Sequence, residues 1–147
     1  MRLKRIPHWE RALAQFIMGR RRVPFIRGIQ DCSMFACDGI WAITGTDIAA
    51  DVRGKYRTEE EAQSLLQELT GGGGFHSYIQ LLTDRYEILP VPVKLARRGD
   101  CVIIMLKAGP SLGIIGTDGV YALFPGESGL EQVKVLDCDG AWKIGWE

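Results

Sequence analysis

The 147-residue sequence lacks several features that would assign it directly to a class of protein. Eighteen Lys and Arg residues balance eighteen Asp and Glu residues, so the basic excess of a nucleic-acid-binding domain is absent and we expect no nucleic acid partner. No apolar run approaches the ~18 residues that a membrane span needs. Arg2, Lys4 and Arg5 are not followed by the apolar segment of a signal peptide. We therefore expect a protein made and folded in a cytoplasm, with no membrane span.

The four cysteines are too dispersed to predict a metal centre. Cys32 and Cys37 form one Cys-x4-Cys pair, whereas Cys101 and Cys138 lie far from it in the sequence. A metal or iron–sulfur site would need the two distant thiols to converge on that pair. We expect reduced, mostly buried thiols, no cofactor and no metal. A redox or metal module built on Cys32 and Cys37 is a further hypothesis.

Helical patterns fill the first half of the chain. Apolar spacing predicts helices over about residues 7–18, from Cys32 to a stop at Gly45, over about 48–52, after residue 58, and over about 75–84. Asp31 is a good N-cap for the Cys32 helix, and Thr58 with Glu61 forms a capping box for a later one. The four glycines at 71–74 end that later helix.

The second half of the chain is typical of short strands separated by turns. We expect strands over 86–88, 101–106, 112–115, 120–124, 130–135 and 141–146. The β-branched run from 101 to 106 indicates a central strand, whereas Pro90 and Pro92 favour an edge or a connector. Helices before strands predict an α+β fold, in which N-terminal helices pack on a C-terminal antiparallel β-sheet. The length predicts a single domain, residues 1–147.

The Cys32 helix carries the main candidate for chemistry. It is apolar nearly all round, and such a helix is expected to be buried. A cysteine in its first turn is either a nucleophile activated by the helix N-terminus or a small apolar core residue.

Short patches of the sequence resemble the NlpC-type cell-wall peptidases, which have the papain-like cysteine peptidase fold. Asp31-Cys32 is similar to the start of their nucleophile helix, residues 98–102 to the turn and strand before the histidine base, and residues 111–114 to the strand that carries this base. The resemblance implies a papain-like fold, with Cys32 as the catalytic residue if the protein is active.

The chain departs from that family where the base is expected. Ser111 stands at the histidine position, and the position of the third, orienting residue falls near Tyr121 or Ala122. A serine hydroxyl cannot accept a proton from a thiol near neutral pH, and an unperturbed thiol is only a few per cent thiolate there. His8, His76 or a histidine from a neighbouring subunit are the alternative bases. We therefore expect an inactive peptidase with a degenerate site.

A second resemblance spans nearly the whole chain, to a small family of uncharacterised bacteriophage proteins encoded among tail genes. It depends on Pro24-Phe25, Thr44 to Asp47, Arg53 to Tyr56, Gly71 to Gly74, Arg97 to Asp100, Leu112 to Ile114 and Ala141-Trp142. It implies a structural protein of the tail tip or baseplate, located in the virion after assembly in the host cytoplasm. Its implied partners are other phage tail proteins, the hub and the distal tail protein. The alternative is a cysteine endopeptidase or amidase that cleaves peptidoglycan during cell-wall penetration.

Overall fold

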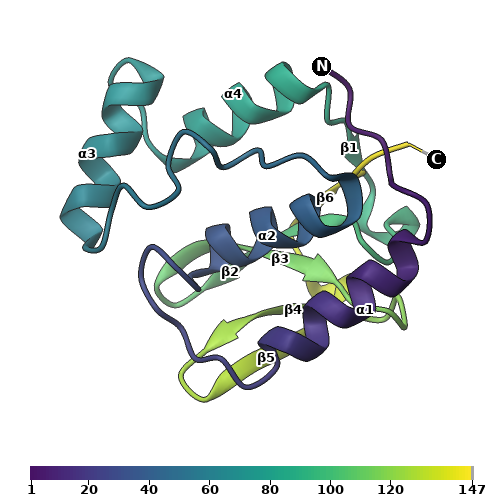
Figure 1. Ribbon diagram of the computed structural model, residues 1–147. Coiled ribbons are helices and arrows are strands. Elements are labelled where there is room, and N and C mark those ends of the chain that lie inside the picture. The colour runs from purple at the N-terminus through teal and green to yellow at the C-terminus, as the bar shows by residue number, and fades with distance from the viewer. Residues whose placement is uncertain (147) are drawn as a thin grey trace.

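The computed structural model describes residues 1–146, and its helices precede its strands (Figure 1). The helices are α1 (Trp9–Arg20), α2 (Cys32–Thr44), α3 (Glu59–Thr70) and α4 (Phe75–Tyr86). The strands are β1 (Pro90–Val91), β2 (Cys101–Leu106), β3 (Gly109–Ile115), β4 (Tyr121–Gly126), β5 (Gly129–Lys134) and β6 (Gly140–Trp142), with 3-10 turns η1 (Val93–Leu95) and η2 (Val135–Asp137). The predicted α+β order is confirmed.

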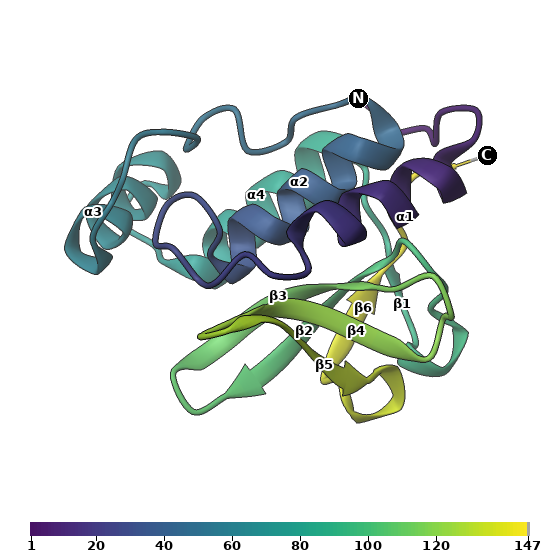
Figure 2. The same ribbon diagram turned by 60° about the horizontal axis from the view of Figure 1, so that its bottom comes forward.

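The strands form one antiparallel sheet in the order β1-β6-β2-β3-β4-β5. β2 lies inside the sheet, between β6 and β3, as its β-branched run predicts. β1 lies at an edge and pairs with β6 through Pro90 and Val91, where a proline costs no ladder hydrogen bond. Figure 2 shows α1, α2 and α4 layered over one face of the curled sheet. No helix among residues 1–146 is long and apolar enough to cross a membrane.

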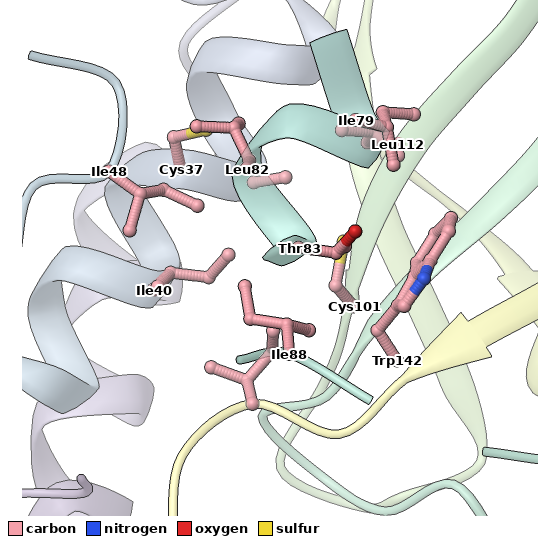
Figure 3. Close-up of a pocket in the computed structure, with 12 residues that line it drawn as sticks. Cys37, Ile40, Ile48, Ile79, Leu82, Thr83, Ile88, Cys101, Leu112 and Trp142 are labelled. Carbon is pink, nitrogen blue, oxygen red and sulfur yellow. The ribbon is translucent and has the colours of Figure 1, made fainter. Parts of the chain in front are cut away.

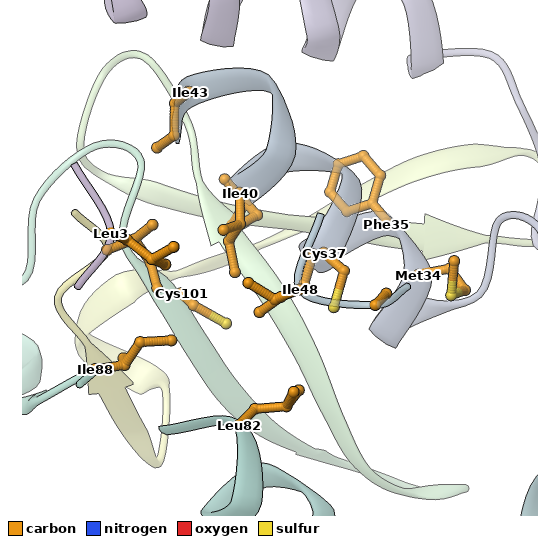
Figure 4. Packing of buried hydrophobic residues seen from close by; sticks show 14 of the residues in the cluster. Leu3, Met34, Phe35, Cys37, Ile40, Ile43, Ile48, Leu82, Ile88 and Cys101 are labelled. Atoms are coloured by element: carbon orange, nitrogen blue, oxygen red, sulfur yellow. The ribbon is translucent and has the colours of Figure 1, made fainter. Parts of the chain in front are cut away.

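The main core lies between this helical layer and the sheet (Figure 4). α2 is its centre, because both Phe35 and Ile43 are fully buried, as the apolar character of the helix predicts. The helix approaches β3 closely at Gly39, where an added Cβ would lie 3.0 Å from the Ile114 side chain. Alternate residues of β2, including Val102, pack into a second hydrophobic cluster. The sheet is therefore packed on both faces.

Three predicted elements differ in the structure. The strand expected over residues 86–88 is wrong: α4 continues through Tyr86, and Glu87 ends it in the left-handed conformation. The short helix expected over 48–52 is instead a series of turns, in which the N–H groups of Val52 and Arg53 both donate to the Ala49 carbonyl. The last strand ends at residue 142, and the chain then pairs with the N-terminal segment through a bridge from residue 146.

Candidate functional site

The turn before α2 fixes the position of Cys32, the first residue of that helix. The Asp31 carboxylate accepts hydrogen bonds from the Met34 N–H at 2.8 Å and the Gly28 N–H at 2.9 Å, which confirms the predicted N-cap. The Tyr56 hydroxyl also donates to Asp31, at 2.5 Å. Gly28 has a φ of +83°, and a Cβ there would collide with the Tyr56 carbonyl oxygen. The turn before α2 is therefore fixed by hydrogen bonds to Asp31 and by the close packing of Gly28 against Tyr56.

The segments Thr44 to Asp47 and Arg53 to Tyr56, which the sequence analysis singles out, meet in an ion-pair cluster against α2. Arg53 donates to both carboxylate oxygens of Asp47 at 2.9 Å, and this contact lowers the pKa of Asp47. Another nitrogen of Arg53 lies 2.7 Å from one oxygen of the buried Asp38, and Arg20 of α1 lies 2.8 Å from the other. The negative charge of Asp38 is therefore matched on both sides. The cluster ties α2 to α1 and to the loop after it.

The structure places Ser111 of β3 beside Cys32. Burial raises the pKa of the Cys32 thiol, and the negative charges of Asp31 and Glu131 raise it further. A hydrogen bond with Ser111 and the positive charge of Arg27 lower it, but the net effect is a raised pKa. At neutral pH the thiol therefore keeps its proton, despite its position at a helix N-terminus.

The acidic neighbour Glu131 comes from a strand that the sequence predicts but does not connect with the site. The positions expected for a third residue do not supply an orienting group, since Ala122 is fully buried in the second core cluster and Tyr121 pairs with Lys134. Glu131 lies on β5, and its carboxylate occupies the space that a side chain at Gly126 would take. Only the pairing of β4 with β5 brings this charge toward the site.

Neither histidine lies at the site. His8 is exposed, in a left-handed conformation just before α1. His76 is exposed on α4, where its ring makes an edge contact with the Phe75 ring. Among residues 1–146, neither lines the groove that contains Cys32, and neither is among the groups that shift the pKa of that thiol.

Cys32 and Ser111 line a groove of about 560 Å³ between α2, α3, α4 and the β2–β3 turn. Its size lies in the range of ligand-binding pockets. A smaller apolar pocket of about 40 Å³ adjoins it and extends to Trp142 of β6 (Figure 3). Cys37 and Leu82 line both spaces. The groove lining combines polar residues adjoining Cys32 in sequence with apolar residues of α3 and α4, and α3 also contributes Glu59 and Gln63.

The other thiols belong to the core. Burial raises the pKa of Cys37 to about 12 and that of Cys138 to about 11, and it also raises that of Cys101. Five positions after Cys32 in one helix, Cys37 projects in a different direction. Within the described residues, no group of three or more potential metal ligands comes together.

Comparison with known proteins places these features in a family. No curated protein matches the sequence at a significant level. Residues 4–144 match a family described as a domain of unknown function, DUF6950. The match includes all of the helices and strands named above, and with them the groove and its lining. The chain therefore belongs to the DUF6950 family.

Proposed function

We propose that the chain is a non-catalytic, NlpC-like structural component of a bacteriophage tail tip or baseplate. The observation that supports this most is the pairing of Cys32 with Ser111, where a papain-like peptidase would have a histidine. The neighbour of the thiol is a hydroxyl, and the pKa of the thiol is raised instead of lowered.

The chemistry of peptide cleavage explains why this substitution matters. Attack on a peptide bond needs a thiolate, and departure of the amine needs an acid that can protonate it. An imidazole supplies both functions in turn, because it takes the thiol proton and later donates it to the amine. When a nucleophile and its base act as a unit, loss of one member removes most of the rate enhancement.

The way α2 is held fits a mechanical role. Its N-terminus is braced through Asp31 and Tyr56, and its middle through Asp38, with Arg20 and Arg53 on either side. These contacts join three segments of the chain around one helix. Together with the resemblance to proteins encoded among tail genes, they support a protein of the virion whose partners are the hub and the distal tail protein.

The test is the rate at which iodoacetamide alkylates the native protein, measured against pH. Cys32 is half-buried while the other three cysteines are buried, so the native reaction reports on Cys32. We expect an apparent pKa above that of a free thiol. Ser111→Ala should raise it further because the hydrogen bond is lost, and Ser111→His should lower it. An apparent pKa well below that of a free thiol in the unmodified chain would contradict the proposal.

The groove favours a second candidate, a cysteine endopeptidase or amidase acting on peptidoglycan. A space of about 560 Å³ beside Cys32 is large enough to admit a substrate. A histidine from a neighbouring subunit would then have to supply the base. Release of peptides from purified peptidoglycan that disappears in Cys32→Ala would establish this function, whereas assembly of infectious particles with Cys32→Ala would support the structural role.

A further inference from the structure

We propose that copies of this chain associate head to tail, with a basic surface beside the chain termini of one copy against helix α3 of the next. The inference depends on charges of opposite sign that gather at opposite ends of the molecule, and on apolar side chains that both ends expose. It goes beyond the proposed function and needs no chemistry at Cys32, so either proposal can fail without the other.

The sequence separates its charges along the chain. Residues 1–57 hold eleven Lys and Arg residues against five Asp and Glu residues. Residues 59–87, which include α3 and α4, hold five Glu, one Asp and a single Arg. The complete chain has a formal net charge of zero, so two copies do not repel each other overall. An attraction between unlike ends can therefore bring two copies together and fix their orientation.

The basic surface lies where the first and last segments of the chain pair with each other. Lys4 and Trp146 form a parallel bridge, and Arg2 lies over the Trp146 ring, 3.9 Å from its centroid. Lys143 lies 5.6 Å from the same centroid. Arg2, Lys4 and Lys143 form no ion pair within residues 1–146. The carboxylate of Glu87 is 3.6 Å from the amine of the first residue, so these two charges offset each other.

Helix α3 is the acidic surface, because it contains four Glu residues and no Lys or Arg. Glu59 pairs with Arg27 at 3.1 Å, and Glu61 completes the capping box. Glu60 and Glu68 are exposed, and neither forms an ion pair in the part of the chain that the structure describes. Two carboxylates of α3 are therefore available to the basic surface of another copy.

Both surfaces also expose apolar side chains. Helix α3 has no buried residue, and Leu65 and Leu66 of its apolar stripe are only half-buried. Beside the basic surface, Leu89 is 55% exposed, and its carbonyl accepts a hydrogen bond from the Lys143 N–H. Contact between the two surfaces would remove these side chains from water, which is favourable in proportion to the apolar area covered.

The two surfaces lie at opposite ends of the molecule. Figure 1 shows α3 on the left and both chain termini on the right, and Figure 2 shows the same separation after the view is turned. One copy therefore cannot bring its own two surfaces together. A contact between unlike surfaces leaves one surface free at each end of the pair, so association continues until a ring closes or a filament grows.

The experiment measures the weight-average mass of the untagged chain by light scattering, and the monomer has a mass of 16.4 kDa. We expect a mass above that of a dimer in about 0.1 M salt and a monomer in about 1 M salt, because the screening length falls from about 10 Å to about 3 Å. The double variants Arg2→Glu with Lys4→Glu and Glu60→Lys with Glu68→Lys should each be monomeric at the lower salt concentration. An equimolar mixture of the two variants should associate again, because each supplies the charges that the other requires.

The matched control makes the same change in charge outside both surfaces. Lys107 on the β2–β3 turn and Lys134 on β5 are exposed, and the double variant Lys107→Glu with Lys134→Glu should associate like the unmodified chain. All substituted side chains in these variants are exposed, and an unchanged urea midpoint would show that each variant is folded.

Zero-length cross-linking with a carbodiimide identifies the contact directly. Mass spectrometry should find Lys4 or Lys143 of one copy joined to Glu60 or Glu68 of another. The inference is overturned if the unmodified chain is monomeric at both salt concentrations, or if its association does not depend on salt. It is also overturned if the control variant dissociates as fully as the two surface variants, if the mixture stays monomeric, or if the cross-links do not involve α3.

Discussion

We expect removal of the Asp100 carboxylate to destabilise the protein, because this side chain joins the N-terminal and C-terminal segments of the chain. Asp100 is 2% exposed and accepts hydrogen bonds from Arg5 at 3.0 Å, the Ile144 N–H at 3.0 Å and the Arg97 N–H at 2.9 Å. In Asp100→Ala the Arg5 guanidinium would keep its charge in a buried place without this carboxylate. Such a change costs about 3–5 kcal/mol.

The magnitude can be measured by urea unfolding followed through tryptophan fluorescence, at neutral pH. A domain of this size has about 5–15 kcal/mol of stability. The expected loss should therefore shift the urea midpoint strongly and lower the Tm by about 6–20 °C. Asp100→Asn keeps an oxygen acceptor and loses the charge, so its cost should be smaller, about 1.5–3 kcal/mol.

An exposed ion pair provides the matched control. Arg98 and Glu10 approach to 3.7 Å, and both side chains are about half exposed, at 49% and 51%. Glu10→Gln should cost about 0–1 kcal/mol. If Asp100→Ala costs no more than Glu10→Gln, the reasoning from burial is refuted. In the double variant Arg5→Met with Asp100→Leu, the cost should be lower than for Asp100→Ala alone, because both buried charges are gone.

Three further changes test other parts of the structure by the same unfolding assay. The pKa of Cys37 is raised to about 12, so its contribution to stability is complete below the ordinary thiol pKa and declines as pH rises toward 12. Cys37 alone should lower the free energy of unfolding by about 1.4 kcal/mol per pH unit in that window, and Cys37→Ala should make the pH dependence shallower by this amount, because the other thiols with raised pKa values still contribute. Tyr56→Phe, which loses the hydrogen bond to Asp31, should lower the free energy of unfolding by about 1.5–3 kcal/mol. A change near zero would show that this hydrogen bond does not contribute to stability. Gly28→Ala should lower the free energy of unfolding clearly more than Gly54→Ala, for which a loss of about 1–2 kcal/mol is expected. Both residues have positive φ, but only at Gly28 does the added Cβ collide with backbone. Equal losses in the two variants would contradict this close contact.

Local signals in the sequence determined the helices and the order of the fold. Asp31 caps α2 and Gly45 ends it in the left-handed conformation, while Thr58 and Glu61 form the capping box of α3. Each of these signals acts within four residues of the helix end, so no knowledge of the rest of the chain is needed. The apolar run that became β2 also predicted its element, because a β-branched run of six residues bounded by turns is typical of a strand.

Contacts between distant segments decided the rest. The residues after Thr83 could suit a helix or a strand, and they became the end of α4, whose Leu82 is buried with Ile88 in the main core against residues from other elements. Glu131 comes toward Cys32 only through the pairing of β4 with β5. Resemblance placed Ser111 at the position of the base, but its hydrogen bond to Cys32 and the raised pKa that burial produces are properties of the packed chain. Periodicity and capping report on neighbours in sequence, whereas desolvation and charge depend on every element that surrounds a group in space.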